Sequence, residues 1–173
     1  MKMTMEKNIV LIGMPGVGKS TIGVILAKEI GYQFLDADLL IQKSEGKLLK
    51  DIIEEKGIDG FLEVENQVNA SIEAERSVIA TGGSAVYGKE AMEHYKQTAL
   101  IVYLRCPFPV LKKRLGDLKG RGVTVRPGQT LKDIYDERTA LYEKYADLVI
   151  NENKKGIEET LALLISALED QDM

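Results

Sequence analysis

The sequence has one cysteine, Cys106, one histidine, His94, and four prolines among 173 residues. A single cysteine cannot form an internal disulfide, and nothing in the sequence pairs Cys106 with His94 as a metal site. The longest apolar runs, such as Ala99–Leu104, have about six residues, against roughly 18 for a membrane span. The apolar stretch from Ile9 is interrupted by Gly13 and cannot serve as a secretory signal. We therefore expect a cytoplasmic protein without membrane contact.

The chain also lacks an excess of positive charge, since its net charge is −4. This balance argues against a dedicated binder of nucleic acid or of a membrane surface. Residues 111–126 depart from it with a local net charge of +5, from six basic residues and one acid: Lys112, Lys113, Arg114, Asp117, Lys119, Arg121 and Arg126. This segment indicates either a local anionic ligand or a solvated helix face.

Strand and helix patterns alternate along the chain, without repeats or a linker. Hydrophobic residues make up 45% and charged residues 29%, which is typical of a globular domain. We predict strands at residues 8–13, 33–36, 77–81, 99–105 and 147–150. Predicted helices lie between and after them, at 19–30, in segments up to 56, and at 59–76, 90–96, 107–118, 130–145 and 156–168. Five short strands separated by helices predict a three-layer α/β/α domain with a parallel sheet.

The first predicted strand leads into a glycine-rich segment that we call the phosphate loop, residues 13–20. Its sequence, Gly13-Met14-Pro15-Gly16-Val17-Gly18-Lys19-Ser20, matches G-x-x-x-x-G-K-[ST] and opens a helix. Glycines let backbone amides surround phosphates, and the helix N-terminus adds partial positive charge. The pattern predicts that Lys19 reaches the β and γ phosphates and that the Ser20 hydroxyl holds Mg²⁺. We predict that the loop and Thr21 after it bind ATP.

The class of nucleotide protein follows from motifs that are absent. A GTPase switch would carry N-K-x-D for base recognition, but Asn153-Lys154-Lys155-Gly156 lacks the aspartate. The chain is also short for a motor or transporter ATPase. A small-molecule kinase fits better, and a non-catalytic ATP-binding regulator is the remaining alternative.

Further strings resemble the shikimate kinase family, in the family's order and near its spacing over almost the whole chain. They are Ser20-Thr21-Ile22-Gly23, Leu35-Asp36-Ala37-Asp38, Gly60-Phe61-Leu62-Glu63-Val64-Glu65, Ala80-Thr81-Gly82-Gly83-Ser84-Ala85-Val86 and Glu137-Arg138-Thr139-Ala140-Leu141-Tyr142. The resemblance implies a P-loop kinase fold like that of nucleoside monophosphate kinases, with a five-stranded parallel sheet in the order 2-3-1-4-5. It also implies ATP-dependent phosphorylation of a small hydroxylated molecule, with shikimate, an intermediate of aromatic amino acid biosynthesis, as the leading acceptor.

The resemblance implies roles for individual acids and glycines. Asp36 would help to order the magnesium shell together with Ser20. Asp38 would bind the acceptor hydroxyls and orient or deprotonate the nucleophile, although it could instead cap the helix that follows. Gly82 and Gly83 match two of the family's three consecutive glycines beneath the acceptor.

The basic residues also receive roles from the resemblance. Arg138 would clamp the carboxylate of the acceptor, and Arg114 would pack near adenine. A lid at about residues 116–129 would bring Arg121 or Arg126 to the γ-phosphate. We expect residues 1–173 to form one kinase domain that acts as a monomer, with acceptor-binding helices at about 38–76.

The sequence departs from the family at two pocket positions. Leu62 stands where the family has a second arginine on the acceptor carboxylate, and Ser84 replaces the third glycine. Helical periodicity predicts that Leu62 faces the pocket. The resemblance implies that the acid at Glu65 would support the family's arginine, so that Glu65 lacks this partner here. Two alternatives follow: a shikimate kinase whose lid supplies the cation, or a kinase for another small hydroxy acid or amino-acid alcohol, similar to gluconate or homoserine.

Overall fold

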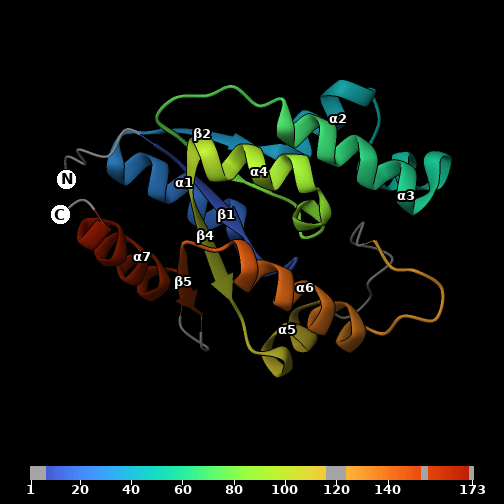
Figure 1. The fold of residues 1–173 in the computed structure, drawn as a ribbon. Helices are drawn as coiled ribbons and strands as arrows, with labels where there is room; N and C mark the ends of the chain where they lie inside the picture. Colours follow the sequence, from blue (N-terminus) through green and yellow to red (C-terminus); the bar gives the residue numbers. More distant parts are fainter. Residues whose placement is uncertain (1–6, 116–123, 153–155, 172–173) are drawn as a thin grey trace.

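The five strands form one parallel sheet in the computed structural model, which describes residues 7–115, 124–152 and 156–171. Its order is β2-β3-β1-β4-β5 (Figure 1), which confirms the predicted fold class and strand order. The strands are β1 (Asn8–Ile12), β2 (Gln33–Asp36), β3 (Ser77–Ala80), β4 (Ala99–Arg105) and β5 (Leu148–Asn151).

Helices connect the strands and follow the last one. They are α1 (Lys19–Ile30), α2 (Ala37–Glu45), α3 (Leu49–Ala70), α4 (Lys89–Thr98), α5 (Phe108–Leu115), α6 (Leu131–Tyr145) and α7 (Ile157–Gln171), with a short 3₁₀ helix η1 (Ala85–Tyr87). The boundaries of several helices follow from local chemistry. Gly31 ends α1 in the left-handed conformation at φ 75°, and Thr130 opens α6 with a capping box to Asp133.

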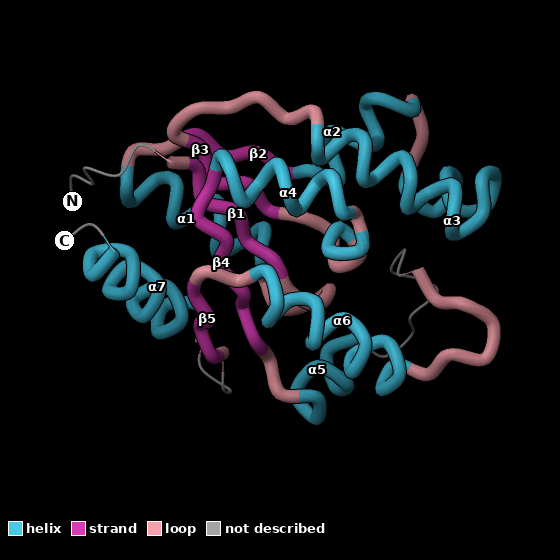
Figure 2. Tube along the Cα trace, in the orientation of Figure 1, coloured by secondary structure: helices cyan, strands magenta, loops and turns pink. Residues whose placement is uncertain are grey.

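The sheet lies between two layers of helices. On one side α1 contacts the sheet and α7, while on the other α4 and α6 contact β4 and α3 packs against α4 (Figures 1 and 2). All five residues of β1, in the middle of the sheet, are buried, as expected for a strand covered on both faces. Among the described residues, none of the helices is long and apolar enough to cross a membrane.

Helix α3 differs from the predicted helix at residues 59–76. It spans Leu49–Ala70, with a kink at Gly57, whose non-helical angles of φ 75° and ψ 175° separate the predicted segment up to 56 from the predicted helix at 59, and it ends before the predicted residue 76. Ile72 follows the apolar spacing of the predicted helix. It lies after the end of the helix, however, and packs into the main core from there. The prediction of a helix to residue 76 was therefore wrong. The predicted end of the basic helix at 118 lies outside the described residues.

Candidate active site

The phosphate loop curves around the amino group of Lys19, at the start of α1. Lys19 Nζ donates hydrogen bonds to the carbonyl oxygens of Gly13 at 2.6 Å and Met14 at 2.8 Å. Gly13 has φ 149°, and a methyl group there would lie 2.7 Å from the Leu104 carbonyl oxygen, so only glycine allows this approach to β4. Burial is the main cause that lowers the pKa of Lys19 to about 8.

Two oxygen-bearing side chains meet beside the loop. Ser20 Oγ donates a hydrogen bond of 3.0 Å to Asp36 Oδ2. The other carboxylate oxygen, Asp36 Oδ1, accepts from the backbone amides of Asp38 and Leu39 and caps α2. Hydroxyl and carboxylate oxygens are the donor types that Mg²⁺ prefers, so this pair suits that ion.

The loop forms one wall of a cavity of about 210 Å³, and acidic and basic side chains form the others. Its lining comes from the loop, α2, α3, the segment after β3, the segment before α6 and α6 itself: Pro15, Gly16, Lys19, Asp38, Leu49, Phe61, Glu65, Thr81, Gly82, Gly83, Ser84, Thr124 and Arg138. The structure therefore brings Lys19, Asp38, Glu65, Gly82, Gly83 and Arg138 together around one cavity, and their roles there stay predictions. Leu49, Phe61, Thr81 and Thr124 are lining residues to which sequence reasoning gave no role, and Ser84 lines the cavity as the replacement for a family glycine.

Asp38 points into this cavity from the first turn of α2. Its Oδ1 is buried and has no hydrogen-bond partner in the part of the chain that the structure describes. Burial, followed by the charge of Asp36, raises the pKa of Asp38 to about 6. A carboxyl group with an unused buried oxygen and a pKa near neutrality is suited to accept a proton from a bound hydroxyl.

Arg138 enters the cavity from α6 and is 1% exposed. Its Nη2 donates to the backbone oxygen of Thr124 at 3.0 Å and to Thr124 Oγ1 at 2.7 Å. The guanidinium also lies over the ring of Tyr87, 5.4 Å from the centroid, and its Nε is buried without a hydrogen-bond partner among the described residues. The guanidinium therefore keeps one donor that no described residue uses.

The two glycines after β3 allow close packing on the cavity floor. A methyl group at Gly83 would lie 2.6 Å from Pro15 Cδ and 3.0 Å from Arg138 Nη1. A methyl group at Gly82 would lie 2.6 Å from Asp38 Oδ1 and 3.0 Å from Glu65 Oε2. The absence of side chains here lets the phosphate loop and both acids approach the same strand end.

Leu62 differs from its expected place. It does not belong to the cavity lining, but packs against a small cluster formed by Ile41, Ile52 and Phe61. Asn66 and Asn69 of α3 do not belong to the cavity lining either, whereas Glu65 does. Asn66 accepts a hydrogen bond from the Ala91 amide, and Asn69 donates one to the Glu65 carbonyl. Apolar packing on α2 and the first half of α3 thus overrides the helical-periodicity argument for Leu62.

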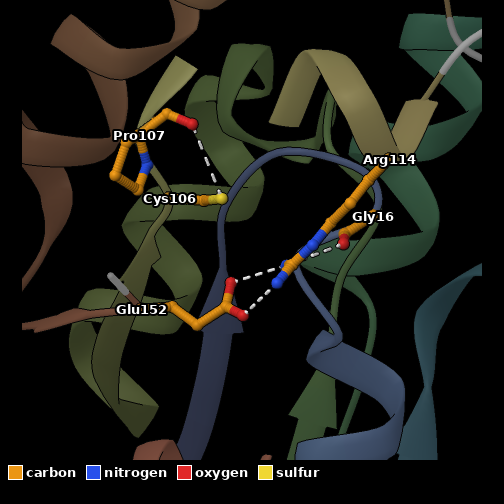
Figure 3. A network of polar contacts seen from close by, with 5 residues as sticks. All are labelled: Gly16, Cys106, Pro107, Arg114 and Glu152. Atoms are coloured by element: carbon orange, nitrogen blue, oxygen red, sulfur yellow. Dashed lines mark hydrogen bonds and ion pairs between the residues drawn. The ribbon is translucent and has the colours of Figure 1, made fainter. Parts of the chain in front are cut away.

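Arg114, in α5, lies beside Gly16 of the phosphate loop and reaches Glu152 (Figure 3). It forms two hydrogen bonds to Glu152, at 2.8 and 2.7 Å, and Nη1 lies 3.4 Å from the Gly16 carbonyl oxygen. Sequence reasoning missed Glu152, and its place directly after the last strand was the available signal. Cys106 is buried beside this pair, and burial raises its pKa to about 11, which leaves it a thiol.

The remaining predicted residues lie away from the cavity or outside the described chain. Arg126 Nη2 pairs with Asp59 Oδ1 of α3 at 2.7 Å, so it does not contact the phosphate loop. Arg121 lies outside the described residues. Val17 is buried within the loop, and Thr21 is exposed on the first turn of α1.

Known proteins resemble this chain over most of its length. The family model for shikimate kinase matches residues 15–169. A shikimate kinase of Sulfurihydrogenibium sp. (strain YO3AOP1) is 36% identical over 150 residues, which cover 86% of this chain and 90% of that protein. A shikimate kinase 2 of Yersinia pseudotuberculosis serotype O:3 (strain YPIII) is 35% identical over 154 residues, covering 85% and 87%.

Solved structures give the same result. The shikimate kinase from Acinetobacter baumannii in complex with shikimate has a TM-score of 0.85 and 30% identity, covering 95% of this chain and 94% of that one. The shikimate kinase of Aquifex aeolicus has a TM-score of 0.82 and 32% identity, covering 96% and 98%. On these matches over nearly its full length, the chain belongs to the shikimate kinase family.

Proposed function

We propose that this chain transfers the γ-phosphoryl group of ATP to a hydroxyl of shikimate, giving shikimate 3-phosphate and ADP. The observation that carries this is that one cavity joins Pro15, Gly16 and Lys19 of the phosphate loop to Asp38 and Arg138. A phosphate donor and a hydroxy acid bound there would lie next to each other, and phosphoryl transfer depends mainly on positioning and charge neutralisation. Family membership and the shikimate complex of the Acinetobacter relative support the choice of acceptor.

Asp38 would act on the acceptor hydroxyl. Its unpartnered Oδ1 accepts the hydroxyl proton while the oxygen forms a bond to the γ-phosphorus and the bond to the β-phosphate breaks, which releases ADP. Lys19 would leave the Gly13 and Met14 carbonyls and neutralise charge on the phosphates. Arg138 would hold the acceptor carboxylate through its unpartnered Nε.

The other nucleotide contacts remain proposals from the family pattern. Ser20 and Asp36 supply the oxygens that would hold Mg²⁺, directly or through water, and the ion would neutralise phosphate charge when bound. Arg114 would lie beside the nucleotide, and Arg121 or Arg126 of the lid at about 116–129 would reach the γ-phosphate. We propose a single domain over residues 1–173, with acceptor helices at about 38–76, that acts as a monomer in the cytoplasm.

A second acceptor class has one observation in its favour. Glu65 is 2% exposed, and its side chain pairs with Ser84, with no ion pair to a lysine or arginine within the described chain. A cavity with the acids Asp38 and Glu65 against Arg138 suits an acceptor with one carboxylate and an ammonium, such as homoserine. A sugar acid such as gluconate would also fit, with a hydroxyl in place of the ammonium.

The test is ADP release by the purified protein with Mg-ATP and a panel of acceptors. Shikimate, homoserine, threonine and gluconate are compared with no acceptor. We expect strong stimulation by shikimate, and stimulation by another alcohol alone would reassign the acceptor. No stimulation by any of them would favour a non-catalytic ATP-binding regulator. Leu62→Arg tests the departure from the family, and a lack of improvement with shikimate would show that position 62 does not limit its use.

A further inference from the structure

Ser84, at the end of the segment that follows β3, makes a contact that none of the roles proposed above explains. Its Oγ donates a hydrogen bond of 2.6 Å to Glu65 Oε1. Both side chains are buried, with 5% of Ser84 and 2% of Glu65 exposed, and both line the cavity. A charge-assisted hydrogen bond of this length between buried groups fixes the orientation of the carboxyl.

The backbone of Glu65 is also fixed. Asn69 Nδ2 donates to the Glu65 carbonyl oxygen at 2.8 Å, and the hydroxyl of Tyr95 in α4 donates to Asn69 Oδ1. The backbone of Glu65 is therefore held from its own helix and from α4, and its carboxyl is held from the segment after β3. A group held in this way can bind a ligand without first losing conformational freedom.

The second oxygen of Glu65 lies over Gly82, as does one oxygen of Asp38. A methyl group at Gly82 would lie 3.0 Å from Glu65 Oε2 and 2.6 Å from Asp38 Oδ1, so both oxygens lie close to the same backbone position. Ser84 occupies only Oε1, and a carboxylate has about four lone-pair sites for hydrogen bonds. Oε2 can therefore accept from a donor group that enters the cavity.

We propose that Ser84 is a positioning residue that fixes Glu65 so that Oε2 binds a second donor group of the acceptor, next to the hydroxyl that Asp38 receives. This inference rests on the proposed function and adds a specificity element to it. The donor is a non-reacting hydroxyl if the acceptor is shikimate, and the ammonium if it is an amino-acid alcohol. In both cases Glu65 recognises the acceptor directly instead of supporting a cation.

Kinetics of Ser84 variants against acceptors that lack one donor test the proposal. Ser84→Ala and Ser84→Thr are compared with wild type. Ser71→Ala is the matched control, because Ser71 Oγ also donates a hydrogen bond, to the Val68 backbone oxygen, but Ser71 is exposed. The acceptors are shikimate, its two analogues that each lack one non-reacting hydroxyl, homoserine, and 4-hydroxybutyrate, which is homoserine without the ammonium. The KM for each acceptor, the KM for ATP and kcat are measured, with thermal unfolding as a check of folding.

We expect Ser84→Ala to raise the acceptor KM about tenfold, with the KM for ATP and kcat changed less than twofold. Ser84→Thr keeps the hydroxyl and should remain within about threefold of wild type, as should Ser71→Ala. The analogue without the recognised donor should bind about tenfold more weakly to wild type but lose nothing further in Ser84→Ala, because both changes remove the same interaction.

Two results would overturn the proposal while leaving the kinase function intact. One is an unchanged acceptor KM in Ser84→Ala with active wild type. The other is an equal further loss in Ser84→Ala for every analogue, which would make the serine a general support of the fold. If wild type releases no ADP with any acceptor, the proposed function itself fails, so the two failures are distinguishable.

Discussion

Asp36, and not Asp38, caps helix α2: Asp36 Oδ1 accepts a hydrogen bond of 3.0 Å from the backbone amide of Asp38. The cap at Asp36 leaves the side chain of Asp38 without a structural role at the helix end. This settles the choice between capping and a position in the cavity that the sequence left open. Asp36 also accepts from Ser20, so one carboxylate connects the helix cap to the phosphate loop.

Removal of the Asp38 charge should abolish most turnover. We expect Asp38→Asn to lower kcat by about 10²- to 10⁴-fold, the usual contribution of a positioned general base. Affinity for ATP, measured by titration calorimetry, should stay within about threefold, because no described contact joins Asp38 to the phosphate loop backbone. Asp51→Asn, which changes an exposed acid of α3, is the control and should keep wild-type kcat. Wild-type turnover in Asp38→Asn would contradict the assigned role.

Stability should depend on pH through the two buried acids. Burial raises the folded-state pKa of Asp38 from 3.8 to about 6 and that of Glu65 from 4.5 to about 7. Between pH 4 and 7 the folded protein holds protons that the unfolded chain has released, so the free energy of unfolding falls as pH rises through this window. Glu65→Gln should remove most of the pH-dependent loss in the free energy of unfolding that Glu65 causes, on the order of 3 kcal/mol at pH 8. Urea unfolding at pH 4, 6 and 8 measures this.

The control for that measurement is Glu63→Gln, an exposed acid on the same helix. It should leave the pH dependence of unfolding unchanged. A Glu65→Gln variant with the same pH slope as wild type would show that Glu65 does not take up a proton in this range.

Loss of Arg114 and loss of Glu152 should lower the free energy of unfolding by different amounts. The side chain of Arg114 is 34% exposed and that of Glu152 is 7% exposed. Arg114→Met leaves a buried carboxylate without its partner, whereas in Glu152→Gln the arginine can turn to water. We expect Arg114→Met to lower the free energy of unfolding by about 2 kcal/mol and Glu152→Gln by about half as much. Urea denaturation of both variants checks the order, and the reverse order would refute it.

A methyl group at Gly83 should disturb the phosphate loop. It would lie 2.6 Å from Pro15 Cδ, closer than packed carbon atoms allow, so the loop has to move. We expect Gly83→Ala to weaken ATP binding at least tenfold and to lower stability by about 1 to 3 kcal/mol. Gly156→Ala is the matched control, because a methyl group there meets nothing within 4 Å. Equal ATP affinity in Gly83→Ala and wild type would rule out this packing argument.

The strand order was predicted well from the family resemblance. The bounds of α1 were predicted well from a local sequence signal, because Gly18 and Gly31 mark its ends with left-handed angles. The place of Leu62 could not be predicted in this way. It depends on packing of α2 against the first half of α3, which brings Ile41, Ile52 and Phe61 together across the break at Gly57.

Contacts between distant parts of the chain account for the other omissions. Glu152 meets Arg114 only because β5 lies beside β4 in the sheet, and 38 residues separate them in sequence. Thr124 contacts Arg138 across a segment with no regular pattern. Such pairs leave no periodic signal in the sequence, since each partner alone is of a residue type that is common on protein surfaces.

The bond from Arg138 to Thr124 has a consequence for the thermodynamics of acceptor binding. It joins residues that are 14 positions apart and involves both the backbone oxygen and the hydroxyl of Thr124. The entropy cost of closing this length of chain is therefore met during folding, before any acceptor arrives. An acceptor that enters the cavity encounters a wall already in place, so more of its contact energy is retained as affinity.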